Sequence, residues 1–307
     1  MDDPLNEASR RARLSGGSGE TADLVRPGPV SGSGMPTTSG LLEDYHTHHR
    51  RCGHAAGELR DMIEAAHKKG LRAVGLSDHA PILHLPGDWP LPNTAMPRSM
   101  FPEYVQEMHD LQREFAGIMP VKAGVEADYV SGFVEAYREL LAPHDFDYVI
   151  GSVHFVDGWS IFSAKLPPQA TREDVWERYL TLTGEAAACG LFDILGHLDC
   201  LKTKGHLPRE WRTPTLLRTL DAIADCQVSI ELNTSGWRKP VGDCFPTFEI
   251  LQLAAQRGIP VCLGSDAHRP KDVAADFGRA VKLLRQAGYQ SLASFTRRKR
   301  EEIPLNT

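Results

Sequence analysis

Two histidines separated by one residue, His46 and His48, follow Glu43-Asp44-Tyr45 near the start of the regularly patterned part of the sequence. In an extended strand, side chains alternate between two faces, so both imidazoles point the same way and Thr47 points away. Two imidazoles on one face at a strand end can hold one metal ion. The pair alone is a weak signal, because short motifs also occur by chance. The same alternation turns His49 to the opposite face, and we leave it out of the predicted metal site.

Residues of the same chemical kind recur at the ends of further strand-like runs. The run 71–79 ends in Asp78 and His79, and the run 260–268 ends in Asp266 and His268 with the same alternating spacing. Three runs between them and the loop after the first pair contribute four more candidates: Glu126, His154, His197 and His54. Taken singly, such a residue is more often a structural histidine or a solvated carboxylate. Their repetition at strand ends favours one shared site.

The chemistry of this set is that of a divalent metal centre. Imidazole and carboxylate ligands together suit zinc, iron or manganese, whereas thiolates would make a softer site. A carboxylate such as Glu126 can bridge two ions. Clustered divalent cations stabilise attacking and leaving oxygens of a phosphoryl group and lower the pKa of bound water to near ~7. The set therefore predicts hydrolysis of a phosphate ester by a hydroxide that a multinuclear metal site activates.

Seven strand-like runs alternate with helical patterns and must position these residues. After the first run, the strands are expected at 71–79, 121–126, 147–154, 192–197, 228–233 and 260–268. The helices are expected at about 58–69, 102–115, 133–141, 172–189, 213–225, 247–256 and 273–289. Such alternation predicts an α/β fold with a parallel sheet and helices outside it. If the sheet closes into a barrel, the carboxyl ends of all strands gather on one face.

Composition limits the other possibilities. Residues 1–40 are rich in Gly, Ser and Pro and predict a disordered extension, and residues 41–307 predict one catalytic domain. The net charge of -6 argues against a nucleic-acid partner, which would favour a basic stripe. No apolar run is long enough to predict a membrane partner. The scattered cysteines, without a CxxC pair, fit a cytoplasmic protein. No feature of the sequence predicts an oligomeric state.

These motifs resemble the PHP (polymerase and histidinol phosphatase) superfamily, and within it the monofunctional histidinol-phosphate phosphatase branch. The resemblance covers nearly all of residues 41–305, and the stretch from Asn233 to Pro240 favours this branch. The motifs that carry it are Asp44-Tyr45-His46-Thr47-His48, Cys52-Gly53-His54, Gly75-Leu76-Ser77-Asp78-His79, Gly124-Val125-Glu126-Ala127-Asp128-Tyr129, Gly151-Ser152-Val153-His154-Phe155, Gly196-His197-Leu198-Asp199, Glu231 to Pro240 and Gly264-Ser265-Asp266-Ala267-His268.

The resemblance implies a distorted (β/α)7 barrel with three divalent ions per chain, of zinc, manganese or iron. It implies that one ion is held by His46, His48, Glu126 and Asp266, a second by Glu126, His154 and His197, and a third by His54, His79 and His268. It also implies hydrolysis of L-histidinol phosphate, a small phosphate ester, to L-histidinol and phosphate in histidine biosynthesis (EC 3.1.3.15).

Four charged residues have predicted supporting roles. Arg238 and Lys202 follow two strands on the expected active face and are candidates for binding the substrate phosphate. The alternative for each is a surface cation beside the site. Asp78 and Asp199 are candidates for orienting neighbouring imidazoles, or for capping the turns that follow them. We assign no catalytic group outside the metal ligands.

Two other functions are compatible with the pattern. One is a PHP phosphoesterase that acts on another phosphomonoester or a nucleotide. A nuclease of this kind should carry a groove rich in Lys and Arg with stacking aromatic residues, and the acidic net charge disfavours it. The other is a metal-binding module without catalysis. Modules that have lost activity usually lose ligands, whereas every expected ligand position is filled here.

Overall fold

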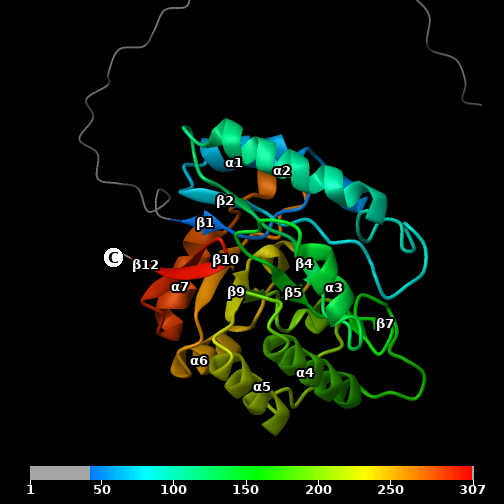
Figure 1. The fold of residues 1–307 in the computed structure, drawn as a ribbon. Coiled ribbons are helices and arrows are strands. Elements are labelled where there is room, and N and C mark those ends of the chain that lie inside the picture. Colours follow the sequence, from blue (N-terminus) through cyan, green and yellow to red (C-terminus); the bar gives the residue numbers. More distant parts are fainter. Residues whose placement is uncertain (1–41, 306–307) are drawn as a thin grey trace, which may run out of the picture. The chain divides into compact units, whose positions relative to one another are not determined.

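Parallel strands in two sheets form the centre of the fold in the computed structural model, which describes residues 42–305 (Figure 1). One sheet has the order β1-β2-β3 and the other the order β10-β9-β8-β5-β4. Their bounds are β1 (Glu43–Asp44), β2 (Ala73–Leu76), β3 (Val121–Ala123), β4 (Glu126–Asp128), β5 (Ile150–Ser152), β8 (Ile194–Leu195), β9 (Ser229–Asn233) and β10 (Val261–Gly264). The predicted α/β fold with parallel strands is confirmed. The disordered extension predicted for residues 1–40 lies outside the described residues.

Isolated parallel bridges join the smaller sheet to both edge strands of the larger one, β10 and β4. Thr47 pairs with Ala267, and His79 pairs with Glu126. The Tyr45 N–H also donates to the Leu263 carbonyl at 2.9 Å, which brings β1 beside β10. The ends of β1, β2, β4 and β10 are therefore held close together.

The run expected as one strand at 121–126 is divided in the structure. β3 pairs with β2, whereas Glu126 opens β4, which pairs with β5. The prediction that Glu126 ends a strand was therefore wrong. The change of sheet occurs beside Gly124, where a Cβ atom would lie only 2.2 Å from the Tyr148 ring. Tyr148 thus packs where the chain passes from one sheet to the other.

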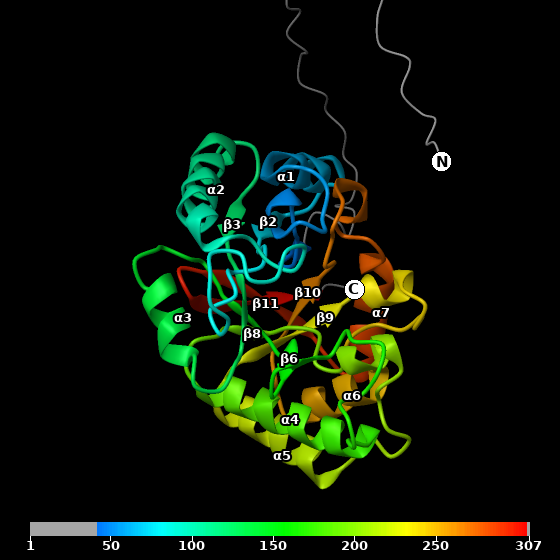
Figure 2. The same cartoon turned by 90° about the vertical axis from the view of Figure 1, so that its right-hand side faces the viewer.

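The helices cover the sheets on two sides (Figures 1 and 2). α1 and α2 lie beside β1–β3, and α4, α5 and α6 lie on the opposite side, next to the larger sheet. Their bounds are α1 (Leu59–Lys68), α2 (Phe101–Phe115), α3 (Val134–Leu141), α4 (Arg172–Ala188), α5 (Pro214–Asp225), α6 (Phe248–Gln256) and α7 (Phe277–Ala287). Short 3-10 helices follow several strands: η2 (Arg50–Cys52), η3 (Arg98–Met100), η4 (Cys200–Lys204), η5 (Ser235–Arg238) and η6 (Pro270–Asp272).

Local sequence explains where the helices start and which face they bury. α1 buries Leu59, Met62, Ile63 and Ala66, which recur at helical spacing and turn one face to the core. A capping box between Thr171 and Asp174 starts α4. The helix expected from residue 273 begins only at Phe277, because Ala274 and Asp276 have left-handed backbones, with φ of 52° and 62°.

The chain ends in a β-hairpin that the sequence analysis did not predict. β11 (Ser291–Thr296) and β12 (Lys299–Pro304) pair antiparallel, and a small hairpin of β6 (Phe155–Val156) and β7 (Trp159–Ser160) lies elsewhere in the chain. The Phe295 N–H donates to the Tyr45 hydroxyl at 2.7 Å. Near the hairpin turn, Arg297 and Arg298 bond to Asp147 and Arg300 to Gln227, which precede β5 and β9. The turn therefore lies at the amino ends of the parallel strands.

No helix within residues 42–305 combines the length and the apolar character needed to cross a membrane.

Candidate metal centre

Eight of the nine predicted metal ligands converge in groups of three whose donor atoms lie within 4.8 Å of one another. The groups of imidazoles and carboxylates are His46/His48/Asp266, His46/Glu126/His197, His79/Glu126/His154 and His48/His79/His268. The predicted convergence of these side chains is therefore observed, with Glu126 at the start of β4 and the others just after the strands that precede them.

Glu126 lies at the centre of the cluster. Its Oε2 lies 2.9 Å from His79 Nδ1 and 3.2 Å from His46 Nε2. Its Oε1 lies 3.0 Å from His197 Nε2 and 3.5 Å from His154 Nε2. The two oxygens thus face different histidines, which is the geometry a bridging carboxylate requires.

A buried glutamate that the sequence analysis missed holds His46. Glu231 Oε2 lies 2.9 Å from His46 Nδ1, so this carboxylate favours the tautomer in which Nδ1 carries the proton. Its Oε1 also accepts the His197 main-chain N–H at 2.8 Å. A Cβ atom at Gly264 would lie 2.1 Å from Glu231 Oε2, so only glycine leaves room for this carboxylate. His46 Nε2 is consequently left free to face the centre of the cluster.

A second chain of contacts leads from His48 away from the cluster. Asp78 lies 3.2 Å from His48 Nδ1 through Oδ1 and 2.5 Å from His49 Nδ1 through Oδ2. Arg51 Nη1 then lies 3.0 Å from His49 Nε2. The Arg51 guanidinium, 2% exposed, also donates to Glu103 and Glu107 at 2.7 and 2.6 Å. The predicted contact between Asp78 and an imidazole is observed, and the ring of His49 contacts Asp78 and Arg51.

Asp266 joins the cluster from the end of β10. Its Oδ1 lies 3.2 Å from His48 Nε2, and its Oδ2 accepts a hydrogen bond from the Ser235 hydroxyl at 2.9 Å. Asp266 has a φ of 49° and His197 a φ of 24°, backbone conformations that non-glycine residues seldom adopt. Strained residues of this kind cluster at functional sites, where the surrounding contacts hold them in place.

His54 lies at the rim and not in any of the close groups found in residues 42–305. Its ring centroid lies 4.8 Å from that of His268 and 5.3 Å from that of His79. It is the one predicted ligand whose donor atoms stand apart.

Cys52 lies near His48 and Asp78, but burial raises the pKa of its thiol, which donates to the His49 carbonyl at 3.1 Å. A protonated thiol is a poor metal ligand.

Burial and neighbouring charges oppose one another throughout the cluster. Burial alone would raise the pKa of Glu126, but His79, His46 and His154 hold it well below its usual value. Burial alone would lower the pKa of His46, but Glu231 and Glu126 raise it well above its usual value. Burial, together with the neighbouring His48, lowers the pKa of His268 to about 3. Ionised carboxylates are therefore concentrated in a buried place that a cation would stabilise.

The buried atoms without a hydrogen-bond partner in the described part of the chain include three at the centre of the cluster: His46 Nε2, His48 Nε2 and Glu126 Oε2. Unpaired buried polar atoms cost free energy, so they require another partner. All three face one another across the cluster, and nitrogen and oxygen donors of these types suit zinc, manganese or iron. The residues present therefore fit divalent metal ions.

A cavity of about 520 Å³ opens onto the cluster. Besides the donors, its lining includes Phe155, Phe162 and Phe245 together with Asn93 and Ser160. Two cations, Lys204 and Lys239, also line it. The Lys239 Nζ lies 3.5 Å from Asp266 Oδ2 and 3.0 Å from the Ser235 hydroxyl. A small anionic molecule can therefore reach the donors beside Lys239.

The two cations predicted to bind phosphate, Lys202 and Arg238, are not among the residues that line this cavity. Lys202 Nζ donates to Asp199 at 2.9 Å, Asp243 at 2.7 Å and the Cys244 carbonyl at 2.5 Å, which uses all its protons. Arg238 donates to the Ser265 carbonyl at 2.5 Å and does not line the cavity. Phosphate binding by Lys202 and Arg238 stays a prediction.

The contacts of Asp199 also differ from those expected of a residue that orients an imidazole. Its carboxylate accepts from Lys202 and from the Thr247 N–H at 2.9 Å. A further acid that contacts an imidazole, and that the sequence analysis missed, is Asp128, whose Oδ1 lies 2.7 Å from His154 Nδ1. Asp128 lies two residues after Glu126, a spacing that places both on one face of β4, and this spacing could have found it.

Parallel strands whose carboxyl ends bear clustered imidazoles and carboxylates define an α/β protein with a centre for divalent metal ions. Comparison with known protein families gives a more specific assignment than this class. Residues 44–235 match the profile of the PHP domain family, and the chain belongs to this family.

Relatives of the chain carry related names. A Deinococcus radiodurans protein named "Probable histidinol-phosphatase" is 38% identical over 84% of this chain and 98% of that protein. A Bacillus subtilis protein named "Histidinol-phosphatase" is 28% identical over 75% of this chain and 94% of that protein. A solved structure of the Lactococcus lactis histidinol phosphate phosphatase, complexed with zinc, L-histidinol and phosphate, has a TM-score of 0.73 and 24% identity. It covers 85% of this chain and 99% of that one.

Proposed function

We propose that this protein hydrolyses L-histidinol phosphate to L-histidinol and phosphate, using divalent metal ions held by the clustered donors. The observation that carries the proposal is Glu126, a buried carboxylate whose two oxygens face different sets of histidines. The relatives named histidinol-phosphatase support the substrate, because this chain matches 98% of one and 94% of another.

The ligand assignment stays as the sequence predicts it, with one adjustment. Three ions are proposed, of zinc, manganese or iron: the first with His46, His48, Glu126 and Asp266, the second with Glu126, His154 and His197, and the third with His79 and His268. His54 lies outside the close groups of residues 42–305, so its side chain would have to move to bind the third ion. Bound ions would activate water for attack and neutralise the phosphate.

The protein's own residues orient the ligands and the substrate. Glu231, Asp78 and Asp128 each hold one ring nitrogen of a histidine, so that the other nitrogen faces the cluster. Lys239 is the cation best placed to contact the phosphate, because it lines the cavity and lies beside Asp266. Phe155, Phe162 and Phe245 supply the apolar wall that an imidazole ring would contact.

Two broader proposals rest on the same structure. The bridges Thr47–Ala267 and His79–Glu126, which join the smaller sheet to both edge strands of the larger one, support a distorted (β/α)7 barrel. The six cysteines, all free, support a reducing compartment such as the cytoplasm.

The test is phosphate release from a panel of phosphomonoesters that includes L-histidinol phosphate and nucleotides, with zinc- or manganese-loaded protein. We expect the highest kcat/KM for L-histidinol phosphate. A higher kcat/KM for a nucleotide would replace the substrate and favour a different phosphoesterase. Full metal loading with no turnover of any ester would favour a metal-binding module without catalysis.

A further inference from the structure

A buried hydroxyl group outside the proposed ligand set contacts the central carboxylate of the metal centre. Ser152, 1% exposed, is the last residue of β5 and donates to Glu126 Oε1 at 2.6 Å. This length is typical of a hydroxyl bonded to an ionised carboxylate. Ser152 pairs in register with Asp128 of β4, and its carbonyl accepts the Tyr129 N–H at 2.8 Å. The strands that carry Ser152 and Glu126 are therefore held side by side.

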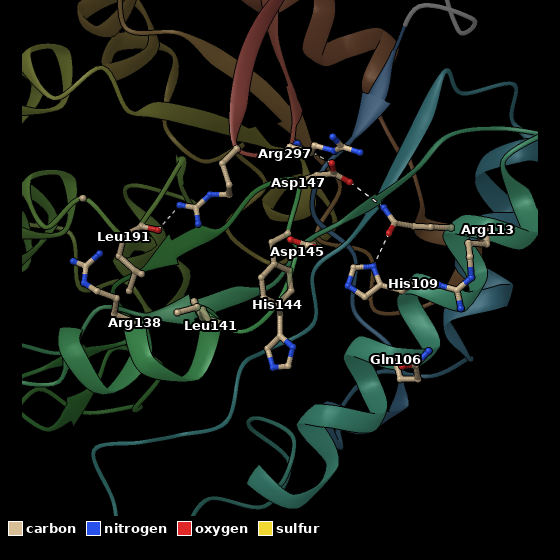
Figure 3. A pocket seen from close by; sticks show the side chains of 15 residues that line it. Gln106, His109, Arg113, Arg138, Leu141, His144, Asp145, Asp147, Leu191 and Arg297 are labelled. Atoms are coloured by element: carbon tan, nitrogen blue, oxygen red, sulfur yellow. Dashed lines mark hydrogen bonds between the residues drawn. The ribbon is translucent and has the colours of Figure 1, made fainter.

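The segment that leads into β5 is anchored as well. Asp147, just before β5, lines a separate cavity of about 980 Å³ (Figure 3). Its carboxylate accepts the main-chain N–H groups of Arg297 and Ala123, both at 2.9 Å, and the Gln112 amide at 3.0 Å. Contacts at both ends of β5 therefore fix the position of Ser152 along the strand.

The bond from Ser152 differs from the other contacts of Glu126. The other groups close to the Glu126 oxygens are the imidazoles of His46, His48, His79, His154 and His197. A ring nitrogen that holds a metal ion must be unprotonated, so it cannot donate to Glu126 at the same time. Within residues 42–305, Ser152 is the one hydrogen-bond donor to the Glu126 side chain that is not a predicted ligand. Its bond can therefore persist when ions are bound.

The fold leaves space for this hydroxyl. A Cβ atom at Gly196 would lie 2.6 Å from Ser152 Oγ, and the next nearest atom, Ile150 Cγ2, would lie 3.1 Å away. Gly196 is not among the residues with positive φ, so its backbone does not require glycine. Burial alone does not explain the bond to Glu126 either. Ser229 in β9 is 0% exposed, yet its hydroxyl has no hydrogen-bond partner in the described part of the chain.

A second predicted ligand has the same kind of partner. Asp266 Oδ2 accepts from the Ser235 hydroxyl at 2.9 Å, whereas its Oδ1 lies 3.2 Å from His48 Nε2. A hydrogen bond of this kind limits the rotation of a carboxylate without adding a charge, and ligating carboxylates are commonly oriented in this way.

We propose that Ser152 is a positioning residue of the metal centre: its hydroxyl holds the Glu126 carboxylate in the orientation in which the two oxygens face different histidines. Without the hydroxyl, the carboxylate can turn, and the ion proposed to bind through Oε1 with His154 and His197 loses a fixed ligand. Gly196 supports the arrangement because it leaves room for the hydroxyl. This inference rests on the ligand role of Glu126 in the proposed function.

The test compares metal affinity in Ser152→Ala and Ser229→Ala, two variants that each remove one buried hydroxyl. Zinc binding to the full-length protein would be measured by competition with a chromophoric chelator. We expect Ser152→Ala to raise the Kd of one bound ion about 10–100-fold, the range for a lost partner of a metal ligand. Ser229→Ala should bind zinc as the wild type does, because no contact within residues 42–305 uses its hydroxyl. Equal Kd values for Ser152→Ala and the wild type would overturn the proposal.

A second readout separates positioning from a loss of stability. Manganese ions that share a carboxylate are magnetically coupled, so electron paramagnetic resonance distinguishes them from an isolated ion. At a manganese concentration that just fills the wild type, Ser152→Ala should show more of the isolated-ion signal. A lower melting temperature of metal-free Ser152→Ala, together with the coupled signal and the Kd of the wild type, would make Ser152 a structural residue and refute its positioning role.

Gly196→Ala tests the space around the hydroxyl. Its methyl group would displace Ser152 Oγ, so we expect it to weaken zinc binding in the wild type and to add little in Ser152→Ala, where Oγ is absent. Equal losses in both backgrounds would contradict this role of Gly196.

Zinc affinity can be measured without turnover, which separates this proposal from the proposed hydrolysis. Weaker zinc binding in Ser152→Ala, with no hydrolysis of any ester by the wild type, would support the positioning role and refute only the hydrolysis. Unchanged zinc binding in Ser152→Ala, beside normal hydrolysis of L-histidinol phosphate by the wild type, would refute only the positioning role.

Discussion

Replacing Glu231 with glutamine should weaken metal binding while preserving the shape of the side chain. Oε1 can still accept the His197 N–H at 2.8 Å and the Asn233 amide at 2.9 Å. The new NH2 group would then face His46 Nδ1, which now lies 2.9 Å from a carboxylate oxygen. Two donors cannot bond, so the His46 proton moves to Nε2. That nitrogen could then no longer hold a metal ion, since ligands must be unprotonated.

The structure sets the size of this effect. In the variant a neutral amide replaces the carboxylate in this buried hydrogen bond, and a hydrogen bond to a charged group contributes about 1.5–3 kcal/mol. Removing a partner that orients a metal-bound histidine typically costs roughly 10–100-fold in affinity or activity, or about 1.4–2.8 kcal/mol. The two estimates agree. We expect the Kd of the ion bound through His46 to rise about 10–100-fold.

The assay is competition with a chromophoric chelator, together with metal content per chain after dialysis. Glu301→Gln is the control, because Glu301 is an exposed carboxylate on β12. It removes the same charge far from the metal centre and should bind metal as the wild type does. If Glu231→Gln retains wild-type metal affinity and turnover, the orienting role of Glu231 is wrong.

Three further changes test the surroundings of the metal centre. Asp266→Ala should lower turnover by more than ~100-fold and leave the fold largely intact, because a direct ligand matters more than an orienting partner. Arg51→Met should destabilise the metal-free protein by about 1–3 kcal/mol, since His49 Nε2 loses its partner, and should weaken metal binding through Asp78 and His48. Metal affinity should fall as the pH falls, because protons compete with the ions for the same nitrogens and oxygens.

Each change has its own measurement. Phosphate release and circular dichroism test Asp266→Ala, and unchanged turnover would remove Asp266 from the ligands. Chemical denaturation and chelator competition test Arg51→Met, and a loss of stability without any change in affinity would reduce Arg51 to a structural role. A chelator titration across pH tests the competition with protons, and an affinity independent of pH would exclude these donors.

Much of the metal centre could be predicted because its ligands lie at the ends of short apolar runs. The alternating pairs His46/His48 and Asp266/His268 indicate their own geometry. Glu231 was missed because it lies inside an apolar run, where only the small residues opposite it, such as Gly264, make space for a carboxylate. Lys239 was missed because it follows Arg238, and only the fold determines which of the two cations turns towards the cavity.

The C-terminal hairpin could not be found from turn chemistry. Its two central residues are Arg297 and Arg298, whereas the sequence signal for such a turn is Asn-Gly. The strand at 121–126 was misjudged because Gly124 permits the chain to change sheets against Tyr148, a contact between residues distant in sequence. Periodicity reports which face of an element is buried, but not which partner covers it.

The most direct test of the account is phosphate release from L-histidinol phosphate as divalent ions are returned to chelator-stripped protein. We expect no turnover in the stripped protein and turnover that rises with the number of ions bound per chain until the donors are filled. Full turnover by the stripped protein, or no turnover once the ions are bound, would contradict it.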